Sequence, residues 1–294
     1  MRSIGNSATP LVILIISSGL NIILDLLFII ELNKGIAGAA LATVISQGVS
    51  AVIIFVYCYG KTNLLNLNKA EISFDRHIFN AVFKYSIFTA LQQSVMNLGI
   101  LMVQGLVNTF GITVIAAFAA AVKVDSFAYM PLQDFGNAFS TFIAQNHGAE
   151  KKDRIRQGLK SAILISGIYA VIISVIVFIF GKWLMLIFIK ENNTEIIAIG
   201  AKYLRIEGTF YVLIACLFLL YGFYRGIGRP ALSFILTVIS LGTRVGLSYA
   251  MAHGYEMAYL WIWWSIPIGW FLADLIGVFL ILRNEKIKKI TECR

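Results

Sequence analysis

The stretch "PLVILIISSGLNIILDLLFII", residues 10–30, decides the fold class. It carries one charged side chain, Asp25, and shows no alternation of polar and apolar residues. At about 1.5 Å per residue, a helix of this length crosses the ~30 Å hydrocarbon core of a bilayer. A barrel strand would instead be short and would alternate. The stretch therefore predicts a transmembrane α-helix.

The remainder of the chain repeats this pattern. Of 294 residues, 59% are hydrophobic and 13% charged, against roughly 45–50% and 25% in soluble domains. We therefore expect an all-α polytopic membrane protein with about eight transmembrane helices. The expected spans are 9–30, 36–57, 85–110, 113–144, 159–180, 205–224, 231–252 and 259–282.

The distribution of Lys and Arg predicts the orientation. Basic residues concentrate at alternate span ends, in segments 61–84, 151–160, 225–229 and 283–294, whereas the opposite ends hold few. By the positive-inside rule, both termini are cytoplasmic in a multi-pass protein of the cell membrane. This topology accounts for the net charge of +9, so the charge does not indicate a nucleic-acid partner.

Two short matches suggest an internal repeat. "RSIG" at residues 2–5 resembles "RGIG" at residues 225–228, and Gly35, Ala39, Leu41 and Ser46 share their spacing with four residues of segment 254–265. The first two spans would then repeat the last two. On this reading about four helices of a first half are absent, and we expect the chain to be the C-terminal portion of something longer.

Segment 95–160 resembles the seventh and eighth helices of MATE (multidrug and toxic compound extrusion) transporters. The resemblance is carried by "NTFG", "IAAF", "MP" and above all "AQNHGAEKKDRI". "RSIGNSATP", "LNIILDLLFI" and "GIAGAALATVIS" resemble the fifth and sixth helices of that family in the same order. The resemblance implies an antiporter of two six-helix lobes. Residues 1–60 would be the last two helices of an incomplete N lobe, 61–84 a cytoplasmic interlobe linker, and 85–294 a six-helix C lobe with a basic cytoplasmic tail.

Asn21, Asp25 and Thr43 are the candidate coupling site. Asn21 and Asp25 share one helix face, and Thr43 lies at a similar depth on the next span. Their oxygens suit a hard cation, and a desolvated carboxyl group can instead hold a proton. The resemblance implies the same three residues as an N-lobe cation site for Na⁺ or H⁺, whose fourth, acidic member belongs to a first helix that has no counterpart here. Hydrogen bonding between helices is the alternative role.

A polar stripe on the third span is a candidate substrate cavity. Its members, Gln93, Asn97, Gln104 and Asn108, lie within about 60° of one another on a helix. We expect them to face the lobe interior, where amide bonding between helices is the alternative role. Some MATE members place a Glu on this helix and an Asp on the tenth. Here only Glu207 is available, expected near the outer end of its span, which argues against such a C-lobe site.

Further charges fall inside expected spans and have no assigned role, although pairing between helices would explain each of them. They are Lys123, Asp125, Asp134, Arg244 and Asp274.

The resemblance implies export of cationic or amphipathic compounds by antiport with Na⁺ or H⁺. The chain shows no hydrolase or P-loop motif, so we expect no enzyme, and no cofactor or metal beyond a Na⁺ at Asp25. Three cysteines are scattered without disulfide or metal spacing. Two alternatives stay open: a flippase of lipid-linked saccharides, and a non-transporting fragment or half-subunit that needs a separate N-terminal half as its partner.

Overall fold

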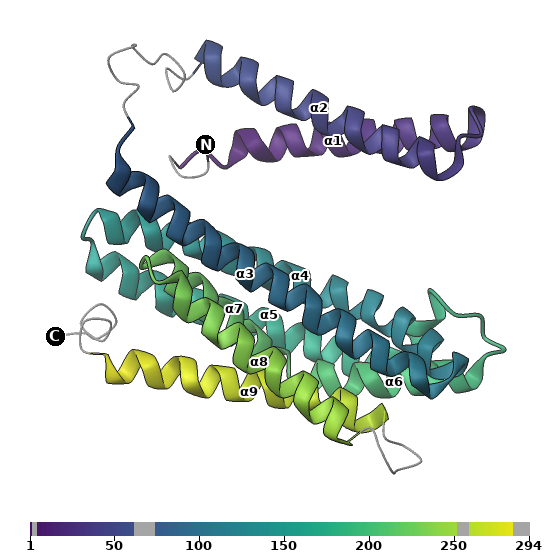
Figure 1. The fold of residues 1–294 in the computed structure, drawn as a ribbon. Helices are drawn as coiled ribbons and strands as arrows, with labels where there is room; N and C mark the ends of the chain where they lie inside the picture. The colour runs from purple at the N-terminus through teal and green to yellow at the C-terminus, as the bar shows by residue number, and fades with distance from the viewer. Residues whose placement is uncertain (2–4, 62–73, 252–258, 285–294) are drawn as a thin grey trace. The chain divides into compact units, whose positions relative to one another are not determined.

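The computed structural model describes residues 1, 5–61, 74–251 and 259–284, and within them every regular element is helical (Figure 1). Within these described residues, seven helices are long and apolar enough to cross a membrane, and a bent pair would form an eighth span. The chain divides into two compact units, Met1–Phe79 and Asn80–Arg294. The predicted all-α membrane class is confirmed. The helices are α1 (Ala8–Leu26), α2 (Gly35–Lys61), α3 (Arg76–Val107), α4 (Ile112–Gly148), α5 (Lys152–Leu186), α6 (Thr194–Thr209), α7 (Tyr211–Gly226), α8 (Pro230–Met251) and α9 (Tyr259–Arg283).

The first unit contains an antiparallel hairpin of α1 and α2. A π-helical turn, Leu27–Glu31, extends α1 toward the connection. The Ser17 hydroxyl donates to the Ser46 carbonyl at 2.9 Å. A Cβ atom at Gly38 would lie only 3.0 Å from the Phe28 side chain. Small residues therefore bring the two helices together, as is usual where lipid supplies no hydrophobic drive for association.

The centre of the second unit is the contact between α4 and α7. A Cβ atom at Gly136 would lie 2.8 Å from the Phe218 carbonyl oxygen, and one at Gly222 would overlap the Gly136 carbonyl. One turn further along, a Cβ atom at Gly226 would lie 2.6 Å from Ile143. Glycine thus allows the two backbones to touch directly along several turns.

The α8–α9 pair packs beside α7, and hydrogen bonds join α8 to α9 and α9 to α7. The Ser248 and Ser265 hydroxyls are 2.9 Å apart, and the Tyr224 hydroxyl donates to the Gly277 carbonyl at 2.7 Å. These bonds satisfy buried polar groups that have no access to water.

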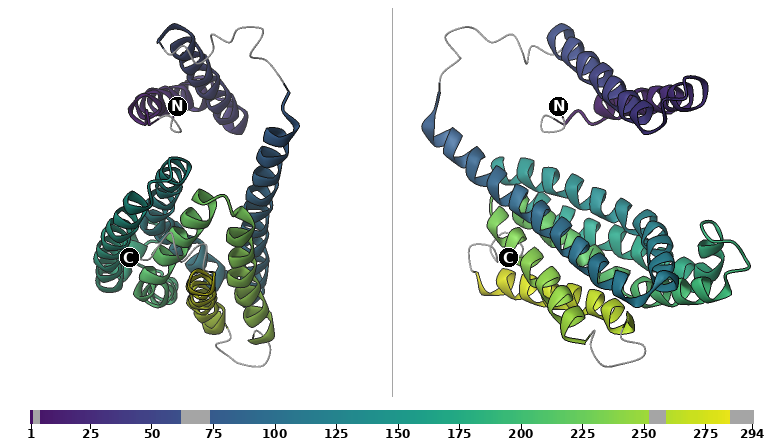
Figure 2. Two further views of the ribbon diagram at one scale, coloured as in Figure 1. Left: turned by 90° about the vertical axis from the view of Figure 1, so that its left-hand side faces the viewer. Right: turned by 45° about the vertical axis from the view of Figure 1, so that its right-hand side comes forward.

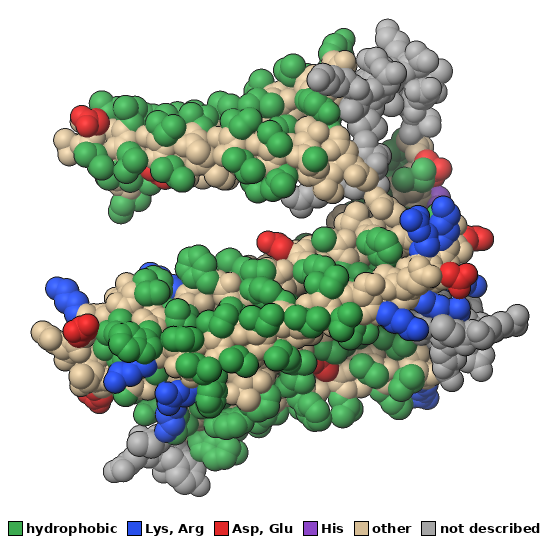
Figure 3. Space-filling model, turned by 180° about the vertical axis from the view of Figure 1, so that it is seen from behind, with side chains coloured by type: hydrophobic (Ala, Val, Ile, Leu, Met, Phe, Trp, Pro, Cys, Tyr) green, Lys and Arg blue, Asp and Glu red, His purple; other side chains and the backbone are tan. Residues whose placement is uncertain are grey.

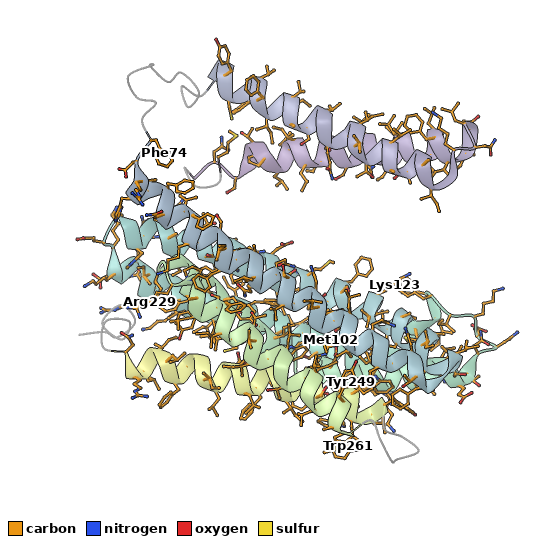
Figure 4. The ribbon with its side chains drawn as sticks, in the orientation of Figure 1. Phe74, Met102, Lys123, Arg229, Tyr249 and Trp261 are labelled. Carbon is orange, nitrogen blue, oxygen red and sulfur yellow. The ribbon has the colours of Figure 1, made fainter. Side chains whose placement is uncertain are left out.

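Helix α3 lies along one edge of the second unit, beside α8 (Figure 2). The Gln92 amide donates to the Thr237 hydroxyl at 2.9 Å. Near the other end of α3, the Tyr249 hydroxyl donates to the Met102 carbonyl at 3.4 Å (Figure 4). The contact between α3 and α8 is therefore made mainly by side chains.

The interlobe linker predicted for residues 61–84 is shorter in the structure, because α3 already begins at Arg76. Asp75 precedes the first turn, and its carboxylate accepts hydrogen bonds from the backbone N–H groups of His77 (2.7 Å) and Ile78 (3.2 Å). An aspartate at this position satisfies the free N–H groups of a helix start. Residues 62–73 lie outside the described part of the chain.

Hydrophobic side chains cover the outward faces of the helices, while Lys and Arg gather near helix ends (Figure 3). Helix α5 shows this most clearly, since Leu164, Ile168 and Ile179 are all more than half exposed. Such exposed apolar surface suits a lipid environment.

We expect Gly136→Val to lower the unfolding temperature of the purified chain, because the new side chain would press on the α7 backbone. Overpacking of this kind costs about 1–3 kcal/mol. Gly167→Val on α5 is the matched control, since a Cβ atom there meets nothing within 4 Å. Thermal unfolding in detergent measures both variants, and equal unfolding temperatures would contradict the packing argument.

Candidate functional site

A break between α6 and α7 forms one side of the candidate site. The two helices meet at an angle of 54°. The Thr209 hydroxyl donates to the Arg205 carbonyl at 2.7 Å, a side-chain bond that bends helices. The N–H of Phe210 then bonds to the Glu207 carbonyl, three residues back, at 2.9 Å. Discontinuous helices of this kind are typical of transporter binding sites.

The position predicted for Glu207, near the outer end of its helix, is wrong. The predicted span 205–224 would have placed this residue close to the outer end of a helix. Helix α6 instead begins at Thr194, so Glu207 lies in the last turn before the break, only 1% exposed. The polar segment before residue 205 obscured the true start of the helix.

A cavity of about 140 Å³ opens beside this break. Sites for small organic ligands usually measure roughly 300–1,000 Å³, so this cavity is too small for a drug-sized molecule. It can hold water or an ion. Its polar lining residues are Gln104, Asp125, Tyr129, Gln133, Tyr203, Glu207, Tyr221, Thr237, Ser240 and Arg244.

Asp125 of α4 and Glu207 of α6 are the acidic members of this lining. Asp125 is 6% exposed, and its carboxylate accepts a hydrogen bond from the Tyr211 hydroxyl at 2.6 Å. Asp125 and Glu207 line the same cavity. One Glu207 oxygen is buried without a hydrogen-bond partner. Sequence reasoning missed this arrangement, since it needs the fold to bring α4 and α6 together.

Arg244 of α8 is the basic member of the lining. It is half-buried, and its Nε atom has no hydrogen-bond partner. Among the residues that the structure describes, no Lys or Arg nitrogen lies within 4.0 Å of the Asp125 or Glu207 oxygens. The interhelical pairing expected for the intramembrane charges is therefore not a direct ion pair at Asp125 or at Arg244.

Aromatic rings enclose the site on the α6 side. The Tyr203 ring packs edge-on against Phe118 at a centroid distance of 5.4 Å and against Trp263 at 5.6 Å. Such contacts keep bulk water away from the carboxyl groups and lower the local dielectric.

Of the predicted polar stripe on α3, only Gln104 lines this cavity. Gln93, Asn97 and Asn108 are exposed on the second unit and do not face its interior as expected. The role of the four residues in a substrate cavity stays a prediction. Helix α3 packs instead through a face that contains Gln92 and Gly99, about 130° away at ~100° per residue. The spacing of the polar residues did not show that the face with the small residue Gly99 is the one that packs closely.

The other intramembrane charges lie apart from the cavity. Lys123 is exposed and stands over the Phe188 ring at 5.8 Å (Figure 4), and Asp134 is exposed. Asp274 of α9 is 7% exposed, and neither of its carboxylate oxygens has a hydrogen-bond partner. It lies next to the Cys216 thiol.

In the first unit, Asn21 and Asp25 share one side of α1. The Asn21 amide nitrogen and one Asp25 oxygen are buried and have no hydrogen-bond partner. Thr43 is exposed, and its hydroxyl donates to the Ala39 carbonyl at 3.0 Å. The hydrogen-bond register of α1 and α2 places Thr43 beside residues 20–23, about one turn from Asp25. The role of the three residues in cation coupling stays a prediction.

Fold and site together define a polytopic helical membrane protein, with ionisable groups held inside a bundle that contains a broken helix. The MatE family model matches residues 86–250. The chain belongs to the MATE family.

Curated relatives carry names that indicate drug resistance. The chain is 29% identical over 244 residues to the probable multidrug resistance protein YpnP of Bacillus subtilis, covering 82% of this chain and 53% of that protein. It is 26% identical over 281 residues to the probable multidrug resistance protein NorM of Thermotoga maritima, covering 94% and 59%. The chain thus spans little more than half the length of these relatives.

Solved structures share the fold. A crystal structure of MATE in complex with MaL6 has a TM-score of 0.87 at 24% identity and covers 95% of this chain and 63% of that one. A MOP superfamily transporter from Pyrococcus furiosus has a TM-score of 0.87 at 23% identity and covers 96% and 63%. At this level of identity the likeness concerns the fold alone.

We expect Tyr211→Phe to destabilise the protein, because it removes the only hydroxyl that bonds to Asp125 in the described structure. Loss of a buried hydrogen bond to a charged group costs about 1.5–3 kcal/mol. In Tyr249→Phe, the matched control, the lost hydroxyl is exposed and bonds at 3.4 Å, so the effect should be small. The two unfolding temperatures, measured in the same detergent, test the difference; an unchanged Tyr211→Phe protein would show that the bond contributes little.

Proposed function

We propose that this chain is the C-lobe-containing part of a MATE secondary transporter that exports cationic or amphipathic compounds in exchange for Na⁺ or H⁺. The observation that carries the proposal is the set of ionisable groups inside the spans without direct ion pairs. Asp25, Asp125 and Glu207 all belong to it. Charged groups are costly in a membrane and usually mark ion or substrate pathways. The names of the relatives, multidrug resistance and export proteins, support the same function.

The sign of the charge supports coupling to a cation. The cavity of the second unit is lined by two carboxyl groups and one guanidinium group. This cavity is too small for the exported compound, so its charge concerns the coupling ion and does not separate a drug exporter from a flippase of lipid-linked saccharides. The names of the relatives support the drug exporter, which we keep as the proposed function.

We assign a separate role in transport to each of the predicted domains. Residues 1–60 would contribute the last two helices of an N lobe and its coupling residues, Asn21, Asp25 and Thr43. Residues 85–294 would form the C lobe. Alternating access in such folds is the rocking of one lobe against another. Because the chain spans 53–61% of its first relatives, we propose that export also needs the remaining helices, supplied in the same chain or as a separate half.

In the complete transporter, we expect Asp25→Asn to reduce gradient-driven export of a cationic dye to the level of vesicles without transporter. The amide keeps the shape of the carboxyl group but can neither release a proton nor bind Na⁺ as an anion. Glu31→Gln is the matched control, an exposed acid at the end of the same helix. Dye efflux from everted membrane vesicles, with the amount of inserted protein measured by immunoblot, tests both variants. Full export by Asp25→Asn would refute the N-lobe coupling assignment.

If both termini are cytoplasmic, as we propose, two exposed lysines should differ in accessibility. In a cysteine-free background, Lys34→Cys should react with a membrane-impermeant maleimide added to intact cells, because the connection between α1 and α2 would lie outside. Lys151→Cys, between α4 and α5, should react only after permeabilisation. The reverse pattern of labelling would show that the orientation is inverted.

A further inference from the structure

The inference concerns a surface groove between the end of α5 and the start of α6, with a volume of about 970 Å³. The two helices pack closely beside it. A Cβ atom at Gly200 would overlap Met185, and one at Gly181 would lie 3.6 Å from the Leu204 side chain. The walls of the groove are therefore two helices in direct contact, which keep the lining residues at fixed levels relative to one another.

Four charged side chains line the groove in a definite order. Glu191 lies in the turn between the helices and Glu195 in the first turn of α6, whereas Lys182 and Arg205 lie further from the turn. Arg205 is ten residues after Glu195 and so about 15 Å further along the helix. Figure 3 shows both basic and acidic side chains at this end of the second unit, on the left. The carboxylates thus lie next to the turn, and the cations lie next to the apolar part of the spans.

These four side chains are exposed and do not neutralise one another. Among the residues that the structure describes, none of their carboxylate oxygens lies within 4.0 Å of a Lys or Arg nitrogen. The Arg205 guanidinium instead stands over the Phe178 ring of α5, 6.0 Å from its centroid. The two cations and the two carboxylates are therefore available to bind groups of opposite charge from outside the protein.

Apolar side chains adjoin the charged part of the groove. Trp183, which lines it next to Lys182, is 68% exposed, and Phe178 and Ile179, one turn earlier on α5, are more than half exposed. Tryptophan is typical of the membrane interface, and exposed aliphatic and aromatic side chains suit acyl chains. A ligand that matches both parts needs acyl chains next to a charged headgroup. This favours a phospholipid over a soluble phosphate ester.

The order of the charges matches a zwitterionic headgroup. In phosphatidylethanolamine the phosphate lies next to the glycerol and the acyl chains, and the ammonium group lies beyond it. Lys182 and Arg205 suit the phosphate, which arginine binds through two N–H groups at once. The carboxylates nearer the turn suit a primary ammonium group, which has three hydrogen-bond donors. Phosphatidylglycerol would bring no cation to Glu191 and Glu195, and phosphatidylcholine has no N–H group to donate.

We propose that this groove binds phosphatidylethanolamine, with the phosphate between Lys182 and Arg205 and the ammonium group against Glu191 and Glu195. The acyl chains would lie along α5. The bound lipid would connect the end of α5 to the start of α6 from outside the bundle. The binding needs only the second unit and a membrane, so it does not depend on the proposed export function.

Native mass spectrometry of the purified chain tests the lipid preference. Delipidated protein in detergent is titrated with dioleoyl phosphatidylethanolamine, phosphatidylcholine or phosphatidylglycerol, and the mass gives the number of bound lipids. We expect phosphatidylethanolamine to bind more tightly than either of the others by about fivefold, the effect of one charged contact at an exposed site. Equal affinities, or a preference for another of the three lipids, would overturn the proposal.

Exchanging the carboxylates for amides tests the ammonium contact. Glu191→Gln/Glu195→Gln should abolish the preference for phosphatidylethanolamine over phosphatidylcholine and raise the affinity for phosphatidylglycerol. Glu150→Gln, an exposed acid in the turn between α4 and α5, is the matched control and should keep the preference. A preference that survives in Glu191→Gln/Glu195→Gln would place the lipid elsewhere and refute the assignment.

Removing the cations tests the phosphate contact. Lys182→Ala/Arg205→Ala should lower the affinity for all three lipids by about fivefold. Lys152→Ala/Arg154→Ala, which removes two exposed cations at the other end of α5, is the matched control and should leave the affinities unchanged. Equal losses in the two variants would show that the groove is not the site. Because all these side chains are exposed, each variant should unfold at the temperature of the unchanged protein in lipid-free detergent, which confirms that it folds.

A soluble competitor separates a lipid from a free phosphate ester. Glycerophosphoethanolamine carries the same headgroup without acyl chains. Added in excess, it should leave the bound phosphatidylethanolamine in place, because the contacts with α5 are missing. Displacement of the lipid would mean that the headgroup alone is recognised and would overturn the proposal of a lipid site.

Discussion

Hydrocarbon offers no hydrogen-bond partner, and this constraint governs the whole structure. Every backbone N–H and C=O group inside the spans has to find its partner in the protein, which is why the described residues form helices and no strands. The same constraint applies to side chains. Hydroxyls of α8 and α9 satisfy one another or a backbone carbonyl. Against this background, the buried atoms of Asp25, Glu207 and Asp274 that have no partner stand out as groups whose retention needs a functional reason.

Much of the fold could be predicted from the sequence, because long apolar segments in a membrane protein leave few alternatives to a helix. Seven of the eight expected spans correspond to single helices among the described residues, whereas 205–224 falls on the broken pair α6 and α7. The motifs of segment 95–160 indicated the family that the comparisons then established. The start of α3 could also have been found, since Asp75 before "RHIFNAVFKYS" is a typical helix cap. Segments 1–60 and 85–294 as parts of two lobes remain a prediction.

The site was much less accessible to sequence reasoning. Hydropathy averages over a window of residues, so it could not reveal that a helix beginning at Thr194 breaks at Phe210 and buries Glu207. Polar periodicity found the stripe on α3 but not the direction in which that helix packs, which depends on Gly99 and its contact with Leu241. The meeting of Asp125 and Glu207 joins positions 82 residues apart, and only the tertiary structure supplies such information.

The glycine contacts between α4 and α7 determine which parts of the site can move. Because Gly136 and Gly222 bring two backbones into direct contact, sliding one helix past the other would force carbonyl groups to collide or to separate in an apolar medium. The two helices should therefore behave as one rigid block, with Asp125 and the Tyr211 hydroxyl fixed to it as a single reference point. Glu207 and Arg244 belong to neighbouring helices outside this block. A conformational change would alter the site by moving Glu207 and Arg244 toward or away from the Asp125 carboxyl group, which would stay in place.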